Sequence, residues 1–164
     1  MVGPTSSGRI HSAVDMHVER LRHFPGTVFP ISPVVTRLIP NLFAMNERVV
    51  LCGEWKHGAF SQTAVGAYNV GSIHINFDSS IRTNKNMRCL NIELLSYGGV
   101  GSFAYVKRYA DGTAHPRVPL KKGMELGRFN MGSTVVLIFE APKEFEFTVR
   151  AGEHVRLGQA LGSC

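Results

Sequence analysis

The sequence predicts a mostly β fold, α+β at most, in which two related β units form a barrel-like or sandwich-like core with few short helices. Three observations predict it: strand-like segments dominate the chain after Asn46, a glycine-serine frame occurs twice, and prolines interrupt the apolar segment that precedes them. With 164 residues and 18.0 kDa, the chain fits a single domain, and we treat 1–164 as one.

The first apolar segment, residues 27–43, is cut by Pro30, Pro33 and Pro40. Proline at this density excludes a long helix, so we expect loops and short helical turns. The segment is a candidate for contact with a membrane surface, and a loop that covers the core is an equally good interpretation.

The segments after Asn46 carry the strand pattern. Residues 47–55 (ERVVLCGEW) and 59–78 (AFSQTAVGAYNVGSIHINFD) are rich in β-branched and aromatic residues and are punctuated by glycine, which predicts strands. Residues 102–110 (SFAYVKRYA) and 145–149 (FEFTV) alternate between apolar and polar. Residues 133–140 (STVVLIFE) form a continuous apolar run, which predicts a strand buried on both faces.

An internal repeat links two of these segments. VGAYNVGSIHINFD (65–78) and LGRFNMGSTVVLIFE (126–140) share an aromatic-Asn-apolar-Gly-Ser frame followed by an apolar strand, at an offset of 61 residues. Two similar units of this size predict a duplicated half of a barrel or sandwich.

The net charge of +6 is confined to one part of the chain. Residues 81–122 contain eight Lys or Arg against two Asp or Glu, whereas the segments on either side nearly balance. Such a stretch suits contact with phosphate on anionic lipid or nucleic acid, and a solvated loop explains it equally well.

Several classes of protein are excluded at this stage. The three cysteines are far apart and form no CxxC pair, so we expect neither a disulfide framework nor a structural metal. No apolar run reaches 18 residues, so no membrane-spanning helix is expected, and the N-terminus lacks the apolar core of a secretory signal.

The second copy of the repeat contains a serine in an unusual setting. Ser133 opens the apolar strand directly after Gly132, and glycine lets a hydroxyl approach the carbonyl that precedes it. Attack of this hydroxyl on that carbonyl would turn the peptide into an ester, and elimination followed by hydrolysis would leave an N-terminal pyruvoyl group. Glycine-serine pairs are common, however, and Gly71-Ser72 stands in the same frame.

The wider context resembles one family, the pyruvoyl-dependent phosphatidylserine decarboxylases, and looks closest to their mitochondrial branch. The segments that carry the resemblance are GRFNMGSTVVLIFEAPK (127–143), RHFPGTVFPISP (22–33), LFAMNERVVL (42–51), WKHGAFSQTAVGAYNVGSI (55–73) and VRLGQALGS (155–163). The family's cleavage motif is LGST, and Met131 replaces its leucine. Residues 79–116 match poorly and are interpreted as a variable basic insertion. The N-terminus differs from the family, which suggests a truncated chain or an alternative start.

The resemblance implies a function. Gly132–Ser133 would be the site of autocatalytic cleavage, which separates a β part, 1–132, from an α part, 133–164. Ser133 would become the covalent pyruvoyl cofactor, with no metal, and would form a Schiff base with the serine headgroup of phosphatidylserine, which loses carbon dioxide to give phosphatidylethanolamine. The implied location is the mitochondrial inner membrane, as a peripheral protein.

Other partners follow from the same resemblance. They are an anionic membrane surface and the two cleavage fragments; a homo-oligomer is left open, and no nucleic acid is expected.

The family also implies roles for histidines. His11 matches the second histidine of a YHxxHxP motif and would be the base in maturation, whereas Gly8 stands in place of the first histidine and Ala13 in place of the proline. The family's orienting aspartate would lie upstream of this chain. Thr134, Ser72 and His57 are candidates for the substrate pocket.

Three alternatives to the enzyme remain. In one, the basic stretch 81–122 is a nucleic-acid surface on a small barrel, since SFAYVKRYA (102–110) interleaves aromatic and basic residues, although no recognised RNA-binding motif is present. Another is a fragment that cannot cleave and acts only as a lipid-binding or structural β module. The third is a carrier module, because residues 149–163 resemble the closing strands of biotinyl and lipoyl domains, although no lysine turn that could be modified is present.

Overall fold

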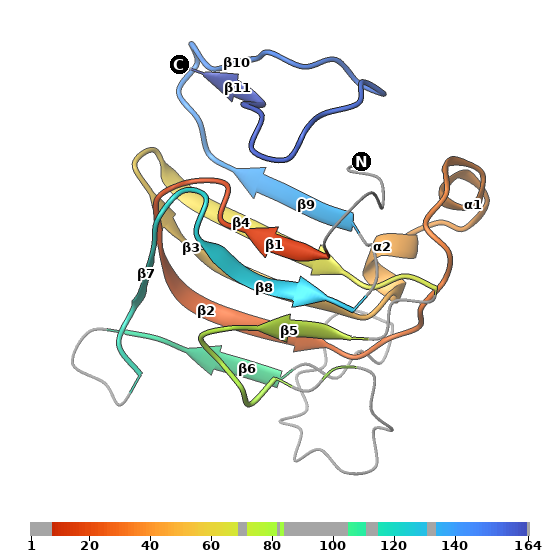
Figure 1. The fold of residues 1–164 in the computed structure, drawn as a ribbon, viewed down its shortest axis with the longest axis horizontal. Coiled ribbons are helices and arrows are strands. Elements are labelled where there is room, and N and C mark those ends of the chain that lie inside the picture. Colours follow the sequence, from red (N-terminus) through yellow and green to blue (C-terminus); the bar gives the residue numbers. More distant parts are fainter. Residues whose placement is uncertain are drawn as a thin grey trace.

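The computed structural model describes residues 8–68, 72–81, 83, 105–110, 115–130 and 134–163. Within them the chain is mostly antiparallel β-sheet with two short helices, which confirms the predicted fold class (Figure 1). The predicted cleavage site at Gly132–Ser133 and most of the basic stretch 79–116 lie outside the described residues.

The larger sheet has the strand order β6-β2-β3-β4-β9, and β7 also pairs with β2. Its strands are β2 (Met16–Phe24), β3 (Arg48–Trp55), β4 (Gly58–Val65), β6 (Tyr105–Arg108), β7 (Val118–Leu120) and β9 (Thr134–Phe139). The central strands alternate as their sequences predict: Val49 and Leu51 on β3, and Phe60 and Ala64 on β4, are buried. Their inward side chains form one wall of the core.

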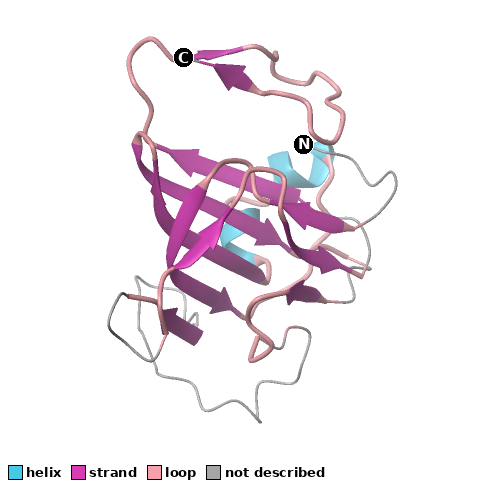
Figure 2. Cartoon of the chain, turned by 60° about the vertical axis from the view of Figure 1, so that its left-hand side comes forward, coloured by secondary structure: helices cyan, strands magenta, loops and turns pink. Residues whose placement is uncertain are grey.

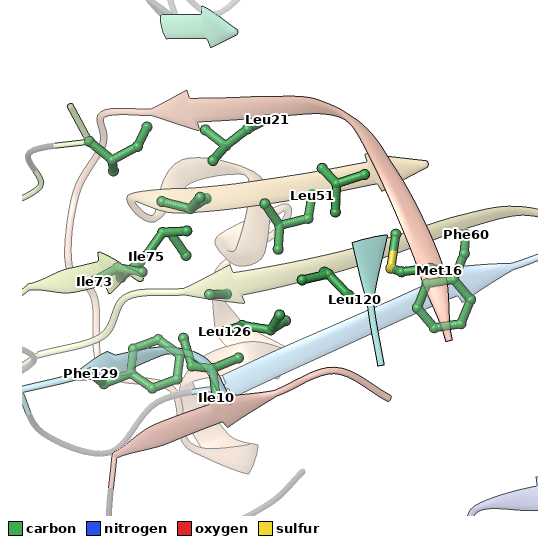
Figure 3. Packing of buried hydrophobic residues seen from close by; sticks show 14 of the residues in the cluster. Ile10, Met16, Leu21, Leu51, Phe60, Ile73, Ile75, Leu120, Leu126 and Phe129 are labelled. Atoms are coloured by element: carbon green, nitrogen blue, oxygen red, sulfur yellow. The ribbon is translucent and has the colours of Figure 1, made fainter. Parts of the chain in front are cut away.

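The smaller sheet supplies the opposite wall. Its order is β1-β8-β5, with β1 (Arg9–His11), β8 (Glu125–Phe129) and β5 (Ile73–Ile75), all antiparallel. Figures 1 and 2 show this sheet lying across the face of the larger one. Between them, Leu126 and Ile75 pack in the same buried cluster as Leu21 and Leu51 (Figure 3). The core is therefore a two-layer sandwich, sealed by burial of aliphatic side chains from both sheets.

The proline-rich segment forms the two helices, α1 (Pro33–Leu38) and α2 (Leu42–Met45), as predicted. Ser32 caps α1 by accepting a hydrogen bond from the Val35 N–H, and Pro33 occupies the first turn, where its missing N–H costs nothing. No residue of α1 is buried, and Val34 and Leu38 are 66% and 73% exposed. None of the helices in the described part is long and apolar enough to span a membrane.

A fully buried asparagine fixes this segment to the sandwich. The Asn46 side chain donates to the carbonyls of Phe29 and Gly66, at 2.9 Å each, and accepts from the Phe29 N–H at 3.0 Å. It therefore ties the loop before α1 to the end of β4, where the first glycine-serine frame begins.

The predicted burial of 133–140 is wrong in part. The strand forms as β9, but it lies at the edge of the larger sheet, pairs with β4, and leaves Ile138 68% exposed. One face packs on the core through Val135, Leu137 and Phe139, whereas burial on the other face falls from buried Thr134 to exposed Ile138. After β9 the chain continues to a small hairpin of β10 (Glu146–Phe147) and β11 (Gly162–Ser163), which stands beyond β9 in Figure 1.

The alternating segment 102–110 is confirmed as a strand over its described residues. β6 pairs with β2, in register from Tyr105 opposite His23 to Arg108 opposite Arg20. Part of the basic stretch is thus built into the larger sheet.

Candidate active site

In each copy of the repeat, the chain leaves one sheet before the glycine-serine frame and enters the other sheet after it. We call this passage the crossing, and the strands that border the two crossings pair with each other. β4 leads into the first glycine-serine frame and β5 leaves it, whereas β8 leads into the second and β9 leaves it. β4 pairs with β9, and β5 pairs with β8, so each copy contributes one strand to each sheet. The resulting register sets Val65 opposite Thr134 and Ile73 opposite Phe129. The fold therefore brings the described residues that flank the two frames to one end of the sandwich.

Ser72, a predicted pocket residue, lies against the second frame. The Asn130 backbone N–H donates to the Ser72 carbonyl at 3.1 Å, and the Asn130 side-chain amide donates to the Ser72 hydroxyl at 2.5 Å. Asn130 is two residues before Gly132 in the chain. The first copy of the repeat is therefore bonded to the residue that leads into the predicted cleavage bond.

Thr134, the residue after Ser133, begins β9 and is only 8% exposed. Its neighbours on either side of the crossing, Val65 and Phe129, are also buried. The chain just after the predicted cleavage bond is therefore buried at Thr134, whereas Asn130, which precedes that bond, is exposed.

His11 lies on β1, opposite Glu125 at the start of β8, roughly 13 Å along that strand from Phe129, after which the second frame follows, at about 3.3 Å per residue. Its backbone carbonyl accepts a hydrogen bond of 2.8 Å from the side chain of Gln62, a residue in the middle of β4. The Nδ1 atom of the His11 ring is buried and has no hydrogen-bond partner among the described residues. A histidine that acts as a base needs its second ring nitrogen held by an acceptor, and this atom is available for one.

Gly8 and Asp15 lie close to His11 in the sequence, and each makes contacts of its own. Gly8, at the place of the family's first histidine, accepts a backbone hydrogen bond from Phe129 next to the crossing. A Cβ added at Gly8 would overlap the Phe129 carbonyl oxygen, so no larger side chain fits this backbone. Asp15 accepts from the backbone N–H of Lys122 at 2.8 Å and thereby holds the turn after β7.

His57 is not brought to the crossing. It lies in the hairpin turn between β3 and β4 and packs edge-on against Trp55, with ring centroids 4.7 Å apart. This turn is at the end of β4 that pairs with Phe139, whereas Thr134 pairs with the other end. At about 3.3 Å per residue, β9 separates the two ends by roughly 16 Å.

Two arginines and a histidine lie in a row on the outer face of the smaller sheet. Arg128 on β8 lies directly opposite Arg9 on β1 and opposite His74 on β5, and all three side chains are exposed. Arg9 also lies 4.0 Å from the Glu125 carboxylate. Because the like charges of Arg9 and Arg128 stand directly opposite each other and repel, the two arginines suit an anionic ligand. Among the described residues, no group of three or more His, Cys, Asp or Glu side chains is arranged to hold a metal ion.

Sequence reasoning missed two residues of this site. Asn130 belongs to the shared frame, directly before the apolar-Gly-Ser tripeptide, and could have been found from the repeat alone. Gln62 occupies an inward position of the alternating strand β4, and its side chain bonds both the His11 carbonyl and the Ala13 N–H. A single polar residue at an inward position of a strand could have indicated this role, because a buried polar side chain needs hydrogen-bond partners.

Comparison with known proteins agrees with the resemblance. The phosphatidylserine decarboxylase family model matches residues 1–163. A mitochondrial phosphatidylserine decarboxylase proenzyme of Pongo abelii is 49% identical over 153 residues, which cover 93% of this chain and 35% of that relative. The mitochondrial phosphatidylserine decarboxylase proenzyme 1 of Saccharomyces cerevisiae is 45% identical over 161 residues, which cover 98% and 31%. The chain spans about a third of the length of the curated relatives it matches.

Proposed function

The chain belongs to the phosphatidylserine decarboxylase family, and from this premise we propose that it carries the self-cleaving core of an enzyme that converts phosphatidylserine to phosphatidylethanolamine. One observation carries the proposal. The predicted scissile bond lies in the sequence between Asn130, which follows β8 and bonds Ser72, and Thr134, which begins β9 and pairs with Val65. The first copy of the repeat thus holds the chain on both sides of that bond.

In the proposed maturation, His11 takes the proton of the Ser133 hydroxyl, and the oxygen bonds to the Gly132 carbonyl carbon as the amide bond breaks. The products of this step are an ester and a free amine at position 133. Elimination then releases the Gly132 carboxylate and leaves dehydroalanine. Its imine tautomer adds water and loses ammonia, which gives the N-terminal ketone. The open Nδ1 of His11 supports this role, because an orienting carboxylate would complete the base. Since His11 pairs with Glu125, the role also requires its ring to approach the second frame from the other end of β8.

A pyruvoyl group at position 133 would supply a ketone that condenses with the headgroup amine and accepts electrons as carbon dioxide leaves. The chain's own contribution to substrate binding is electrostatic. The two arginines Arg9 and Arg128 lie on the smaller sheet, whose strands β5 and β8 border the two frames, and they suit the phosphate of an anionic phospholipid.

Membrane attachment follows the same proposal. The relatives are named mitochondrial, and we propose a peripheral position on the inner membrane for the protein to which this chain belongs. The exposed apolar side chains of α1 support a membrane contact there.

Intact-mass analysis of the purified chain tests the cleavage. Two species that divide at Gly132–Ser133, with the smaller one blocked to Edman degradation, are the expected result, and Ser133→Ala should leave a single 18.0 kDa chain. Ser72→Ala should still be cut. Conversion of phosphatidylserine in vesicles, followed by mass spectrometry of the lipids, then tests the reaction. A wild-type chain that stays whole after long incubation would overturn the proposal for this chain.

A structural or lipid-binding module without cleavage is the second candidate, and Gly8 favours it. The family's first histidine is absent at this position, and the Phe129 carbonyl leaves no room for a side chain there. An uncut chain that still binds vesicles containing phosphatidylserine would decide for this alternative.

A further inference from the structure

The contact between Ser72 and Asn130 is the one direct hydrogen-bonded link between the two glycine-serine frames among the described residues. It consists of two hydrogen bonds, one to the Ser72 carbonyl and one to its hydroxyl, between residues 58 positions apart. The pair is exposed to solvent, so it adds little to the hydrophobic stability of the sandwich. Its effect is therefore on the position of the chain segments that it joins.

The repeat frame identifies the two segments that the contact joins. With the offset of 61, Ser72 holds the position in the first copy that Ser133 holds in the second, and Asn130 holds the position that Asn69 holds in the first. The second copy thus uses its asparagine to bind the serine of the first. The bond fastens the chain two residues before Gly132, while pairing of Thr134 with Val65 fastens it directly after Ser133.

We propose that Ser72 and Asn130 are positioning residues for cleavage at Gly132–Ser133. The inference rests on the proposed self-cleavage and adds two residues to it. Attack of a hydroxyl on its own preceding carbonyl demands a narrow range of backbone angles, and rates fall steeply when reacting atoms are misplaced by about 1 Å. By fixing the end of β8 against the start of β5, the pair restricts the backbone that leads into the scissile bond.

Hydrogen exchange tests the clamp without relying on cleavage. In a Ser133→Ala background, which cannot be cut, Ser72→Ala should raise the exchange rate of the Asn130 amide roughly tenfold, because one of its two links is lost. Asn76→Ala is the matched control. Asn76 is also an exposed asparagine of the smaller sheet, and its side chain donates to the Glu125 carbonyl at 3.3 Å, at the opposite end of β8. Unchanged exchange at Asn130 in Ser72→Ala would overturn the clamp.

Cleavage kinetics test its consequence. Ser72→Ala and Asn130→Ala should each slow the appearance of the two fragments by roughly fivefold to tenfold, and the double variant should be no slower than the worse single one. Ser72→Thr keeps the hydroxyl and should restore the rate, whereas Ser61→Ala on β4 should leave it unchanged. Equal melting temperatures for all variants would separate positioning from general destabilisation.

The outcomes are distinguishable. A wild-type chain that does not cleave overturns the proposed function, and the exchange experiment still decides whether the clamp exists. A wild-type chain that cleaves, with Ser72→Ala and Asn130→Ala equally fast, overturns the positioning role and leaves the proposed function intact. Failure of Ser72→Thr to restore the rate would also count against a role for the hydroxyl.

Discussion

The hydroxyl of Tyr109 donates a buried hydrogen bond of 2.6 Å to the carboxylate of Asp78, across 31 residues of sequence. The same carboxylate accepts from the Ser80 hydroxyl at 2.5 Å and lies 3.2 Å from the Lys107 ammonium. Asp78 follows β5 of the smaller sheet, and Lys107 belongs to β6 of the larger one. This carboxylate therefore joins the two layers at the edge where β6 lies.

Stability should depend on the ionisation of Asp78. Burial raises the pKa of this carboxyl, but the hydrogen bonds from Ser80, Tyr109 and Lys107 lower it by more, so the pKa lies below its usual 3.8. A lowered pKa means that the stabilisation is present above the unfolded value and is lost as the pH falls through the folded one. We expect Asp78→Asn to lower the unfolding free energy by about 2 kcal/mol at pH 6 and by less below about pH 4. Urea unfolding across this range checks it, and a pH-independent difference would contradict it.

Asn46 should be among the most sensitive polar positions. Asn46→Ala leaves the Phe29 amide and the carbonyls of Phe29 and Gly66 without this partner inside the protein, at a cost of about 3 kcal/mol. Urea unfolding measures the loss. The exposed Asn76 is the control, and its alanine variant should change stability by less than about 1 kcal/mol. Similar losses for both variants would show that burial of the Asn46 amide is unimportant.

Gly127 should not tolerate a side chain. It lies on β8 opposite Ile75, and a Cβ there would overlap the carbonyl oxygen of His74. We expect Gly127→Ala to destabilise the chain by more than about 3 kcal/mol, since backbone must move. Gly123 has a φ of 79° and open space around it, so Gly123→Ala should cost only about 1 kcal/mol. Thermal unfolding ranks the two, and the reverse order would refute the steric argument.

Binding to anionic vesicles should depend on α1. Replacing Val34 and Leu38 together by Asp removes exposed apolar area that the bilayer would bury, and should weaken sedimentation with phosphatidylserine vesicles at least tenfold. Ile138→Asp, at an equally exposed position on β9, is the control. If added salt releases the protein while the Asp variants bind normally, the basic residues and not α1 provide the contact.

Local patterns were sufficient for much of the fold. β3 and β4 could be predicted because alternating β-branched residues favour a strand with one buried face, whatever its place in the sheet. The two helices were limited to short turns by prolines, which act through their own backbone. Burial of β9 could not be predicted in the same way, since it depends on the strand order, and an apolar run suits an edge as well as a centre.

The candidate site was predictable only in its chemistry. Ser133 and His11 follow from resemblance, and the repeat marks Ser72 as the counterpart of Ser133. The bond between Ser72 and Asn130 arises because the two copies cross between sheets, a relationship that no local window contains. The position of His57 at the far end of β9 follows from the same strand pairing and was equally hidden.

The edge position of β9 has a consequence for the protein after cleavage. The described part of the C-terminal fragment would be attached to the remainder through the β4–β9 ladder and through packing of Val135, Leu137 and Phe139 on the core. Glu140 adds two hydrogen bonds: its carbonyl accepts from the Trp55 indole at 3.0 Å, and its carboxylate accepts from the Ala59 amide at 2.8 Å. An edge strand can leave without breaking any other strand pair of the sheet. Under the proposed cleavage, the described parts on either side of Gly132–Ser133 would stay together only by noncovalent contacts, so their separation would depend on how readily β9 detaches from β4.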